Sequence, residues 1–282
     1  MEEKTMHIVG FSGGIDSQAC ALYVRHKYPD DQIILLNSNA GRNESPVTEQ
    51  FIADYSANVF PVAQVNAIYA DLWKTEGFAE TKGYNSEDEL TFVEMSKIKG
   101  RWPSRRAQFC TDILKLRPQR RWVEDNIEDD YERYTGVRRD ESEARKNTPF
   151  REWDDYFDCY VNHPLADWTK QKCFDYVRHH GEEINPLYSL GFGRVGCAPC
   201  INSGKDDILR WKQRAPEMID KIRQYEKESG RTFFAPMVPG MYMNNIDEVL
   251  EWCETSRGGR QKDLLRVIND RPACESKYGL CE

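Results

Sequence analysis

The segment IVGFSGGIDSQACALYV, residues 8–24, places the strongest constraint on the fold of this chain. The apolar residues 6–11 predict a buried strand that ends at the sequence SGGIDS, and an amphipathic helix is predicted to follow. Two adjacent glycines let the backbone turn tightly and come close to a ligand. The unpaired N–H groups and the positive dipole end at a helix start favour a bound anion. The pattern therefore predicts a phosphate-binding loop between a strand and a helix.

Six consecutive residues of this loop are expected to contact a nucleotide: Ser12, Gly13, Gly14, Ile15, Asp16 and Ser17. The two serine hydroxyls add to the backbone donors of the anion site. The loop differs from a Walker A loop, because no Gly-Lys-Ser/Thr follows four residues after its first glycine. The alternative interpretation is a glycine-containing turn that binds no phosphate.

Composition restricts the partners, the location and the cysteine chemistry that the chain can have. The 282 residues include 39 basic and 47 acidic side chains, a net charge of −8, so nucleic acid could be contacted only through a local basic patch. The sequence has no run of 18 apolar residues and no charged-then-apolar leader, which predicts a cytoplasmic protein with no membrane span. Nine cysteines in such a chain favour metal binding or sulfur chemistry over a disulfide framework.

Strand and helix patterns alternate along the first part of the chain. Strands are expected at residues 8–11, 32–37 and 59–65, with helices to residue 26 and over 48–58. This alternation predicts an α/β fold, a doubly wound parallel sheet whose ligands bind beyond the carboxyl ends of the strands. Later strands are expected at 133–136 and 158–162, and later helices at 114–126, 170–179, 208–214, 217–229 and 246–256.

Two further segments lack a clear pattern. Mixed helix and loop are expected over residues 66–106. The charged residues 138–158 are expected on the surface or lining the site. We expect a nucleotide-binding α/β domain over residues 1–195, followed by a helical, cysteine-bearing region over residues 196–282.

Polar residues follow the second predicted strand, in the sequence LLNSNAGRNESP. Asn37, Ser38 and Gly41 would lie beside the phosphate loop in a parallel sheet, and Arg42 adds positive charge. A polar turn that caps the next helix is an equally good interpretation of these residues.

An arginine-rich segment, RYTGVRRDESEAR, follows the strand that ends in Gly136. The guanidinium groups of Arg138, Arg139 and Arg145 could bind phosphate or sulfate oxygens in a bidentate manner. The neighbouring acidic residues could instead pair with them in a solvated salt-bridge face, but the position at a strand's carboxyl end favours the phosphate interpretation. A second basic patch, Arg101, Arg105 and Arg106 beside Trp102, could contact a nucleic acid or a partner's acidic face.

Cys197 and Cys200 form a CxxC pair flanked by glycine and proline, which fits half of a zinc or iron–sulfur site, or a redox pair. Further candidate cysteines are Cys110, before a basic helix, and Cys274 and Cys281, near the end of the sequence. The remaining four cysteines lie in apolar or helical contexts and are expected to be buried. His163 is expected to be structural.

Six motifs occur in order along residues 8–282: SGGIDS, FCTDILKLRP, TGVRRDESEAR, HPLADWTKQKCFDYV, NPLYSLGFGRVGCAPC and YGLCE. Together they resemble the phosphoadenosine phosphosulfate reductase family, within the adenine nucleotide α-hydrolase superfamily. SGGIDS resembles the PP-loop signature SGGxDS of the ATP pyrophosphatases, which implies a Rossmann-like PP-loop fold. In such proteins the second strand end commonly holds adenine and ribose.

The chain departs from the reductases of this family at three points. SGGxDS typifies members that cleave ATP to AMP and pyrophosphate, Cys110-Thr111 stands where some reductases have paired cysteines, and YGLC only partly matches their catalytic tail. The nearest type is therefore the ATP pyrophosphatases of bacterial DNA phosphorothioation systems.

The resemblance implies an ATP pyrophosphatase that adenylates a substrate for sulfur transfer, with nucleic acid as the expected acceptor and a cysteine desulfurase as the expected sulfur donor. Asp16 would hold Mg²⁺, and Arg138, Arg139 and Arg145 would stabilise the β and γ phosphates of ATP. A [4Fe–4S] cluster, with zinc as the alternative, would be held by Cys110, Cys197, Cys200 and Cys274, and Cys281 would be a ligand or a persulfide carrier. The competing interpretations are a thioredoxin-dependent sulfonucleotide reductase with Cys281 as nucleophile, and a nucleotide-binding module without catalysis.

Overall fold

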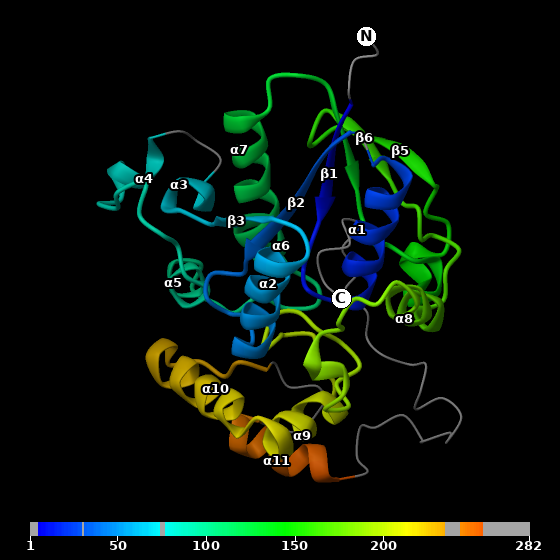
Figure 1. Ribbon diagram of the computed structural model, residues 1–282. Coiled ribbons are helices and arrows are strands. Elements are labelled where there is room, and N and C mark those ends of the chain that lie inside the picture. Colours follow the sequence, from blue (N-terminus) through cyan, green and yellow to red (C-terminus); the bar gives the residue numbers. More distant parts are fainter. Residues whose placement is uncertain (1–4, 30, 74–76, 235–242, 256–282) are drawn as a thin grey trace.

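A six-stranded sheet forms the centre of the computed structural model, which describes residues 5–29, 31–73, 77–234 and 243–255. The strand order is β3-β2-β1-β4-β6-β5 (Figure 1). The strands are β1 (Met6–Gly10), β2 (Gln32–Asn39), β3 (Val62–Asn66), β4 (Tyr131–Tyr134), β5 (Arg151–Asp154) and β6 (Cys159–Asn162). All neighbouring pairs are parallel except β5 and β6, which are antiparallel.

Helices cover both faces of the sheet. On one face, α1 (Ile15–Lys27), α2 (Pro46–Asn58) and α8 (Lys170–His179) share an apolar cluster with Val9 of β1. On the other face, α7 (Arg117–Asn126) packs through Val123 against Ile8 and Leu36. Adjacent residues of a strand point to opposite faces, so Ile8 and Val9 serve the two layers. The predicted doubly wound α/β fold is confirmed.

The sheet is antiparallel at one edge, where β5 lies within the charged segment that was expected on the surface or lining the site. Arg151, Glu152 and Trp153 are exposed there. An edge strand with one open side does not need an alternating apolar pattern, and charged residues protect it from unwanted pairing.

Short helices and turns carry the chain between β3 and β4. They are α3 (Tyr69–Leu72), α4 (Phe78–Thr81), α5 (Phe92–Ile98), α6 (Phe109–Thr111) and the π-helical turn η1 (Asp112–Leu116), which leads into α7. Later in the described part of the chain come the 3₁₀ turns η2 (Arg139–Glu141), η3 (Glu143–Arg145) and η4 (Pro186–Tyr188).

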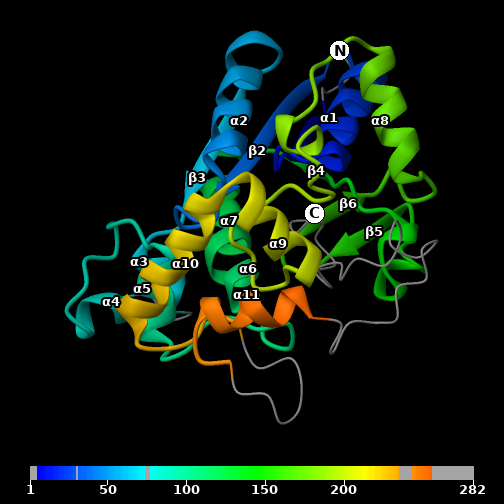
Figure 2. The ribbon, with the colours of Figure 1, turned by 90° about the horizontal axis from the view of Figure 1, so that it is seen from below.

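The predicted helices of the C-terminal region are present as α9 (Lys205–Arg214), α10 (Pro216–Ser229) and α11 (Ile246–Glu254). Figures 1 and 2 show α10 beside α5, and one apolar cluster joins residues of segments 67–114 and 187–253. The boundary at residue 195 therefore remains a prediction, since the helices after it share a core with earlier segments. Within the described residues, every helix is too short or too polar to span a bilayer.

Candidate functional site

The strand order places the loops after β1 and β4 next to each other. β1 lies between β2, its successor, and β4, to which the chain returns much later. Loops that leave neighbouring parallel strands in opposite directions open a crevice at the carboxyl ends of those strands. A pocket occupies this crevice, which we call the strand-end pocket. It is lined by Gly10, Phe11, Ser12, Ser17, Leu36, Asn37, Ser38, Glu44, Lys115, Gln119, Thr135 and Gly136.

Hydrogen bonds inside the SGGIDS loop hold it in a tight turn. Gly13 has a φ of +77°, a conformation that glycine adopts at little cost. The Ser12 amide donates to the Ser17 hydroxyl at 3.1 Å, and that hydroxyl donates to the Gly14 carbonyl at 2.9 Å. Ser17 thus shapes the loop as well as lining the pocket.

The NPLY segment supports the loop from outside. The Ile15 amide donates to the Tyr188 hydroxyl at 2.9 Å, and the Asn185 side-chain amide donates to the Gly13 carbonyl at 3.2 Å. Three amides of the predicted anion site therefore already have partners in the protein, since the Ser12 amide donates to Ser17 and the Gly14 amide donates to the Ser12 hydroxyl at 3.4 Å.

Gly136 brings the β4 loop against the start of α1. A Cβ atom at this position would lie 2.6 Å from the carbonyl carbon and oxygen of Asp16 and 2.9 Å from the Ser17 nitrogen. Only glycine allows this approach without a backbone shift, because real Cβ contacts are not that short. The close approach places the following arginine segment next to Asp16.

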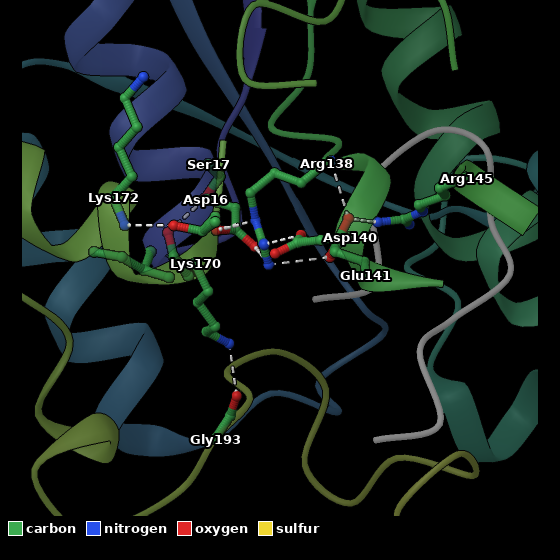
Figure 3. Close-up of polar contacts among 12 residues, drawn as sticks. Asp16, Ser17, Arg138, Asp140, Glu141, Arg145, Lys170, Lys172 and Gly193 are labelled. Atoms are coloured by element: carbon green, nitrogen blue, oxygen red, sulfur yellow. Dashed lines mark hydrogen bonds and ion pairs between the residues drawn. The ribbon is translucent and has the colours of Figure 1, made fainter. Parts of the chain in front are cut away.

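Asp16 and Arg138 form a buried ion pair across the two loops, with side chains 2% and 4% exposed (Figure 3). Arg138 Nε lies 2.8 Å from Asp16 Oδ1, and Nη2 donates to Oδ2 at 3.0 Å. Burial by itself lowers the pKa of Arg138. The negative charges of Asp16, Glu141 and Asp140 raise the pKa by more than burial lowers it, so the guanidinium stays charged. Each oxygen of Asp16 thus has a nitrogen of Arg138 within 3.0 Å, and the Nη2–Oδ2 contact is the hydrogen bond of the pair.

Acidic residues also contact the arginines. Such pairs were expected under the alternative interpretation of this segment as a salt-bridge face. Arg138 donates to Asp140, Glu141 lies 3.9 Å away, and Arg145 donates to Glu141 (Figure 3). The resulting cluster is buried at Arg138 and Arg145, so it is not the solvated face of that alternative.

Arg139 does not join this cluster. Its Nε donates to the Thr148 carbonyl at 2.8 Å, it pairs with Asp167, and its guanidinium lies 4.7 Å from the centre of the Phe150 ring. The side chain is 30% exposed. A role for Arg139 at a nucleotide phosphate therefore stays a prediction, with its guanidinium bound to other partners here.

Residues after β2 take up two different roles. Asn37 donates to the Phe11 carbonyl at 2.8 Å, Ser38 donates to the Lys115 carbonyl at 3.1 Å, and both line the strand-end pocket. Gly41 has a φ of +65°, and a Cβ atom there would lie 2.5 Å from the Phe92 nitrogen. The close approach of α5 therefore explains why glycine occupies position 41.

Four polar residues of the strand-end pocket were not among the predicted site residues: Glu44, Lys115, Gln119 and Thr135. Thr135 precedes Gly136 at a strand end, and Lys115 and Gln119 have the i, i+4 spacing of one helix face. Those two signals could have identified three of the four residues.

Three of the predicted thiols line a second pocket, which we call the thiol pocket. Its lining includes Cys110, Cys197, Cys200 and Lys115, and Lys115 also lines the strand-end pocket. The CAPC turn is held by Asn43, which donates its side-chain amide to the Pro199 carbonyl and accepts from the Ala198 amide, each at 2.8 Å.

The thiols are not arranged as a finished metal site. Within the described part of the chain, no group of three or more histidine, cysteine or acidic residues is placed to hold a metal ion. The other predicted cysteines, Cys274 and Cys281, lie outside the described residues. The donors present are soft thiols suited to zinc or an iron–sulfur cluster, so the ligand type fits although the coordination geometry is absent.

The second basic patch is only partly as expected. Arg101, Arg105 and Arg106 are exposed. Trp102 is 7% exposed and stacks on Phe92 and Tyr225, with ring centres 5.5 and 5.7 Å apart. The arginines therefore form an exposed patch without Trp102, and the prediction that Trp102 belongs to that patch was wrong because its ring is in the core.

The family model "Phosphoadenosine phosphosulfate reductase domain" matches residues 6–203. An uncharacterized 37.8 kDa protein of Escherichia phage 186 is 29% identical over 99% of this chain and 98% of its own length. The adenosine 5'-phosphosulfate reductase of Allochromatium vinosum is 34% identical over 50% of this chain, which spans about half (52%) of that relative. A crystal structure of phosphoadenylyl-sulfate reductase from Candida auris, at 15% identity, covers 68% of this chain and 80% of its own, with a TM-score of 0.45.

Proposed function

The chain belongs to the phosphoadenosine phosphosulfate reductase family, and we propose that it is an ATP pyrophosphatase that adenylates a substrate for sulfur transfer. The observation that carries the proposal is the adjacency of two pockets. The strand-end pocket has the polar lining and loop that a nucleotide requires, and the thiol pocket shares Lys115 with it. A substrate activated in the first pocket would thus lie near sulfur groups in the second.

The reaction would proceed in two displacements. A substrate oxygen attacks the α-phosphorus of ATP, the bond to the β-phosphate oxygen breaks, and pyrophosphate leaves. A sulfur nucleophile then attacks the adenylated centre and AMP leaves with the original oxygen. Adenylation is needed because an oxygen bound to carbon or phosphorus is a poor leaving group near neutral pH, whereas AMP is a good one.

The SGGIDS loop and the arginine cluster would divide the phosphate contacts between them. Ser12, Gly13, Gly14 and Ser17 would surround the pyrophosphate, and Arg138 and Arg145 would stabilise charge that develops on it. Arg138 stays charged in its buried position, which supports this role.

The proposed Mg²⁺ site at Asp16 does not fit the arrangement described above. Both oxygens of Asp16 lie within 3.0 Å of the Arg138 guanidinium, whose positive charge opposes a cation at the same carboxylate. We therefore assign no step to Mg²⁺ bound at Asp16.

Cys110, Cys197 and Cys200, with Cys274, would hold the [4Fe–4S] cluster or a zinc ion. A bound cluster would supply a site that accepts sulfide. Cys281 would act as a further ligand or as a persulfide carrier that receives sulfur from a cysteine desulfurase. The exposed Arg101, Arg105 and Arg106 would contact the phosphates of a nucleic acid acceptor in the cytoplasm.

A sulfonucleotide reductase is the second candidate, favoured by the 34% identity to a protein named adenosine 5'-phosphosulfate reductase. In that reaction the Cys281 thiolate would attack the sulfur of the sulfonucleotide and release the nucleotide. A thiol of thioredoxin would then release sulfite as a disulfide forms.

Product analysis distinguishes the candidates. Purified protein is incubated with ATP and a nucleic acid acceptor, or with a sulfonucleotide and thioredoxin, and pyrophosphate and sulfite are measured. We expect pyrophosphate from ATP, and we expect Ser17→Ala to lower its release about a hundredfold, because the loop loses its central hydroxyl. Ser229→Ala on α10, which removes the same atom outside the pocket, should not change the rate.

Sulfite without pyrophosphate would replace the proposal with the reductase. Neither product, from protein that binds ATP, would leave a nucleotide-binding module without catalysis.

A further inference from the structure

A row of three polar side chains leads from the strand-end pocket to the surface. Thr135 Oγ1 lies 2.7 Å from His163 Nδ1, and His163 Nε2 lies 3.3 Å from Glu152 Oε1. The His163 ring is 1% exposed, whereas Glu152 is 45% exposed. The three residues follow or belong to the adjacent strands β4, β6 and β5, so the row runs across one edge of the sheet.

The Thr135 side chain lies on the side of the sheet that α7 covers. It follows Arg133 by two residues, and Arg133 Nη2 donates to Gln119 Oε1 of α7 at 3.2 Å. Side chains two residues apart share a face of a strand. Gln119 and Thr135 both line the strand-end pocket, so the Thr135 side chain lies on the α7 side of the crevice at the strand ends.

The partners of His163 determine which way the hydrogen bonds run. An ionised Glu152 can only accept, so Nε2 of the ring is the donor. Burial lowers the pKa of His163 from its ordinary 6.5; Glu152 opposes this shift, and Arg145 and Arg133 add to it. The ring is therefore neutral near pH 7 and Nδ1 is an acceptor, to which the Thr135 hydroxyl donates its only proton.

A hydroxyl that has given its proton to a histidine can only accept from anything else. We propose that Thr135 is a specificity-determining residue of the strand-end pocket, and that its oxygen accepts a hydrogen bond from a donor group of the bound adenine nucleotide, with His163 as the positioning residue. The donor groups that such a ligand carries are the ribose hydroxyls and the adenine amino group. A phosphate oxygen at the same place would be disfavoured, because neither oxygen could supply a proton.

The proposal rests on the proposed function only in requiring that an adenine nucleotide binds in the strand-end pocket. A purely structural role would explain the bonds as a brace between strands. The backbone already pairs these segments, however, with the Thr135 amide donating to the Asn162 carbonyl at 3.0 Å.

The test compares nucleotides that each lack one donor. Dissociation constants are measured by calorimetry at pH 7.5 for ATP, 2'-deoxyATP, 3'-deoxyATP and purine riboside triphosphate, which lacks the amino group. We expect the wild-type protein to bind one of the three analogues about tenfold more weakly than ATP, the scale of one hydrogen bond. Thr135→Val, which keeps the side-chain shape, should bind that analogue and ATP equally well.

Two variants of His163 separate positioning from packing. His163→Asn keeps an acceptor near the position of Nδ1 and should retain most of the discrimination. His163→Leu removes this acceptor and should no longer distinguish the analogue from ATP. Thermal unfolding checks that the variant is folded. Thr81→Val on α4 is the matched control for the threonine change and should leave all four constants unaltered.

The outcomes separate this proposal from the proposed function. If the wild-type protein binds no adenine nucleotide, both fail. If it binds ATP and Thr135→Val weakens all four nucleotides by the same factor, or weakens none, the assignment of Thr135 is overturned while the nucleotide site stands. Equal discrimination in His163→Leu and the wild-type protein would overturn the role of His163.

Discussion

Arg138 and Asp16 are joined by two contacts in a part of the protein from which water is excluded. Removing two charges from water is costly, and the pair recovers that cost only while both partners are present. Deleting one partner of a buried pair typically costs about 3–5 kcal/mol of unfolding free energy. Asp16→Ala therefore tests stability as much as activity, and a conservative change on the arginine side is more informative.

Arg138→Lys keeps the charge but loses the planar fork that contacts both oxygens of Asp16. We expect nucleotide binding to weaken by about 1–3 kcal/mol, the scale of a charge-assisted hydrogen bond, and the unfolding free energy to fall by a similar amount. Calorimetric titration with ATP and urea denaturation measure the two effects. Arg139→Lys is the matched control, and its effect on stability should be smaller because Arg139 is 30% exposed. Equal effects of the two variants on stability would contradict the assignment of the buried pair.

At the scale of elements, Glu132 ties three strands together at the edge of the sheet. It lies on β4 and accepts from Tyr134 at 2.9 Å, from Asn162 of β6 at 3.0 Å, and from Arg151 of β5. Burial raises the pKa of Glu132, but the hydrogen bonds and the charge of Arg151 outweigh it, so the pKa lies below its ordinary 4.5. The carboxylate is thus better stabilised in the folded chain than in the unfolded one.

A lowered pKa of a carboxyl group contributes stability above its unfolded value, and that contribution is lost as the pH falls through the folded value. We expect Glu132→Gln to destabilise the protein at pH 7 and to cost progressively less as the pH falls below about 4.5. Urea denaturation across this range measures the difference. Glu124→Gln on α7, whose partner Arg120 is also on α7, is the control and should show a smaller pH dependence. A difference between wild type and Glu132→Gln that stays constant with pH would contradict the role of the charge.

At the scale of the whole molecule, segments from distant parts of the chain build the thiol pocket. Lys221 of α10 donates to the carbonyls of Arg42 at 3.1 Å and Ala198 at 3.2 Å, so one side chain holds the loop after β2 and the CAPC turn together. Burial lowers the pKa of Lys221, although Glu44 raises it in part. The thiols therefore depend on the packing of the C-terminal helices for their position.

Metal analysis of anaerobically purified protein tests the proposed cluster. We expect about four irons per chain, the load of one cubane cluster, and absorbance near 400 nm, roughly where thiolate-to-iron charge transfer occurs. Cys197→Ser should remove both, because Cys197 belongs to the CxxC pair. Cys253→Ser changes a buried cysteine outside the pocket lining and should retain the iron. One zinc and no iron would show a structural metal site instead.

Local pattern in the sequence determined the order and type of most elements. The apolar run before SGGIDS, the periodicity of the helices and the polar strand ends each depend on residues that are close in sequence, because a helix or strand repeats its pattern over a few residues. The same local signals identified the SGGIDS loop, of which Ser12 and Ser17 line the strand-end pocket, and Asn37 and Ser38, which line it as well. The strand β5 was not predicted, because an exposed edge strand carries no such periodicity.

Only the tertiary structure decided which of these residues meet. Asp16 and Arg138 are separated by 122 residues, and their pairing follows from the placement of β4 beside β1 and from the close approach at Gly136. Trp102 is indistinguishable in sequence from a surface aromatic residue, and it is buried because α10 and its neighbours cover it. Contacts of this kind depend on how layers pack rather than on neighbouring residues, so no short window of the sequence contains them.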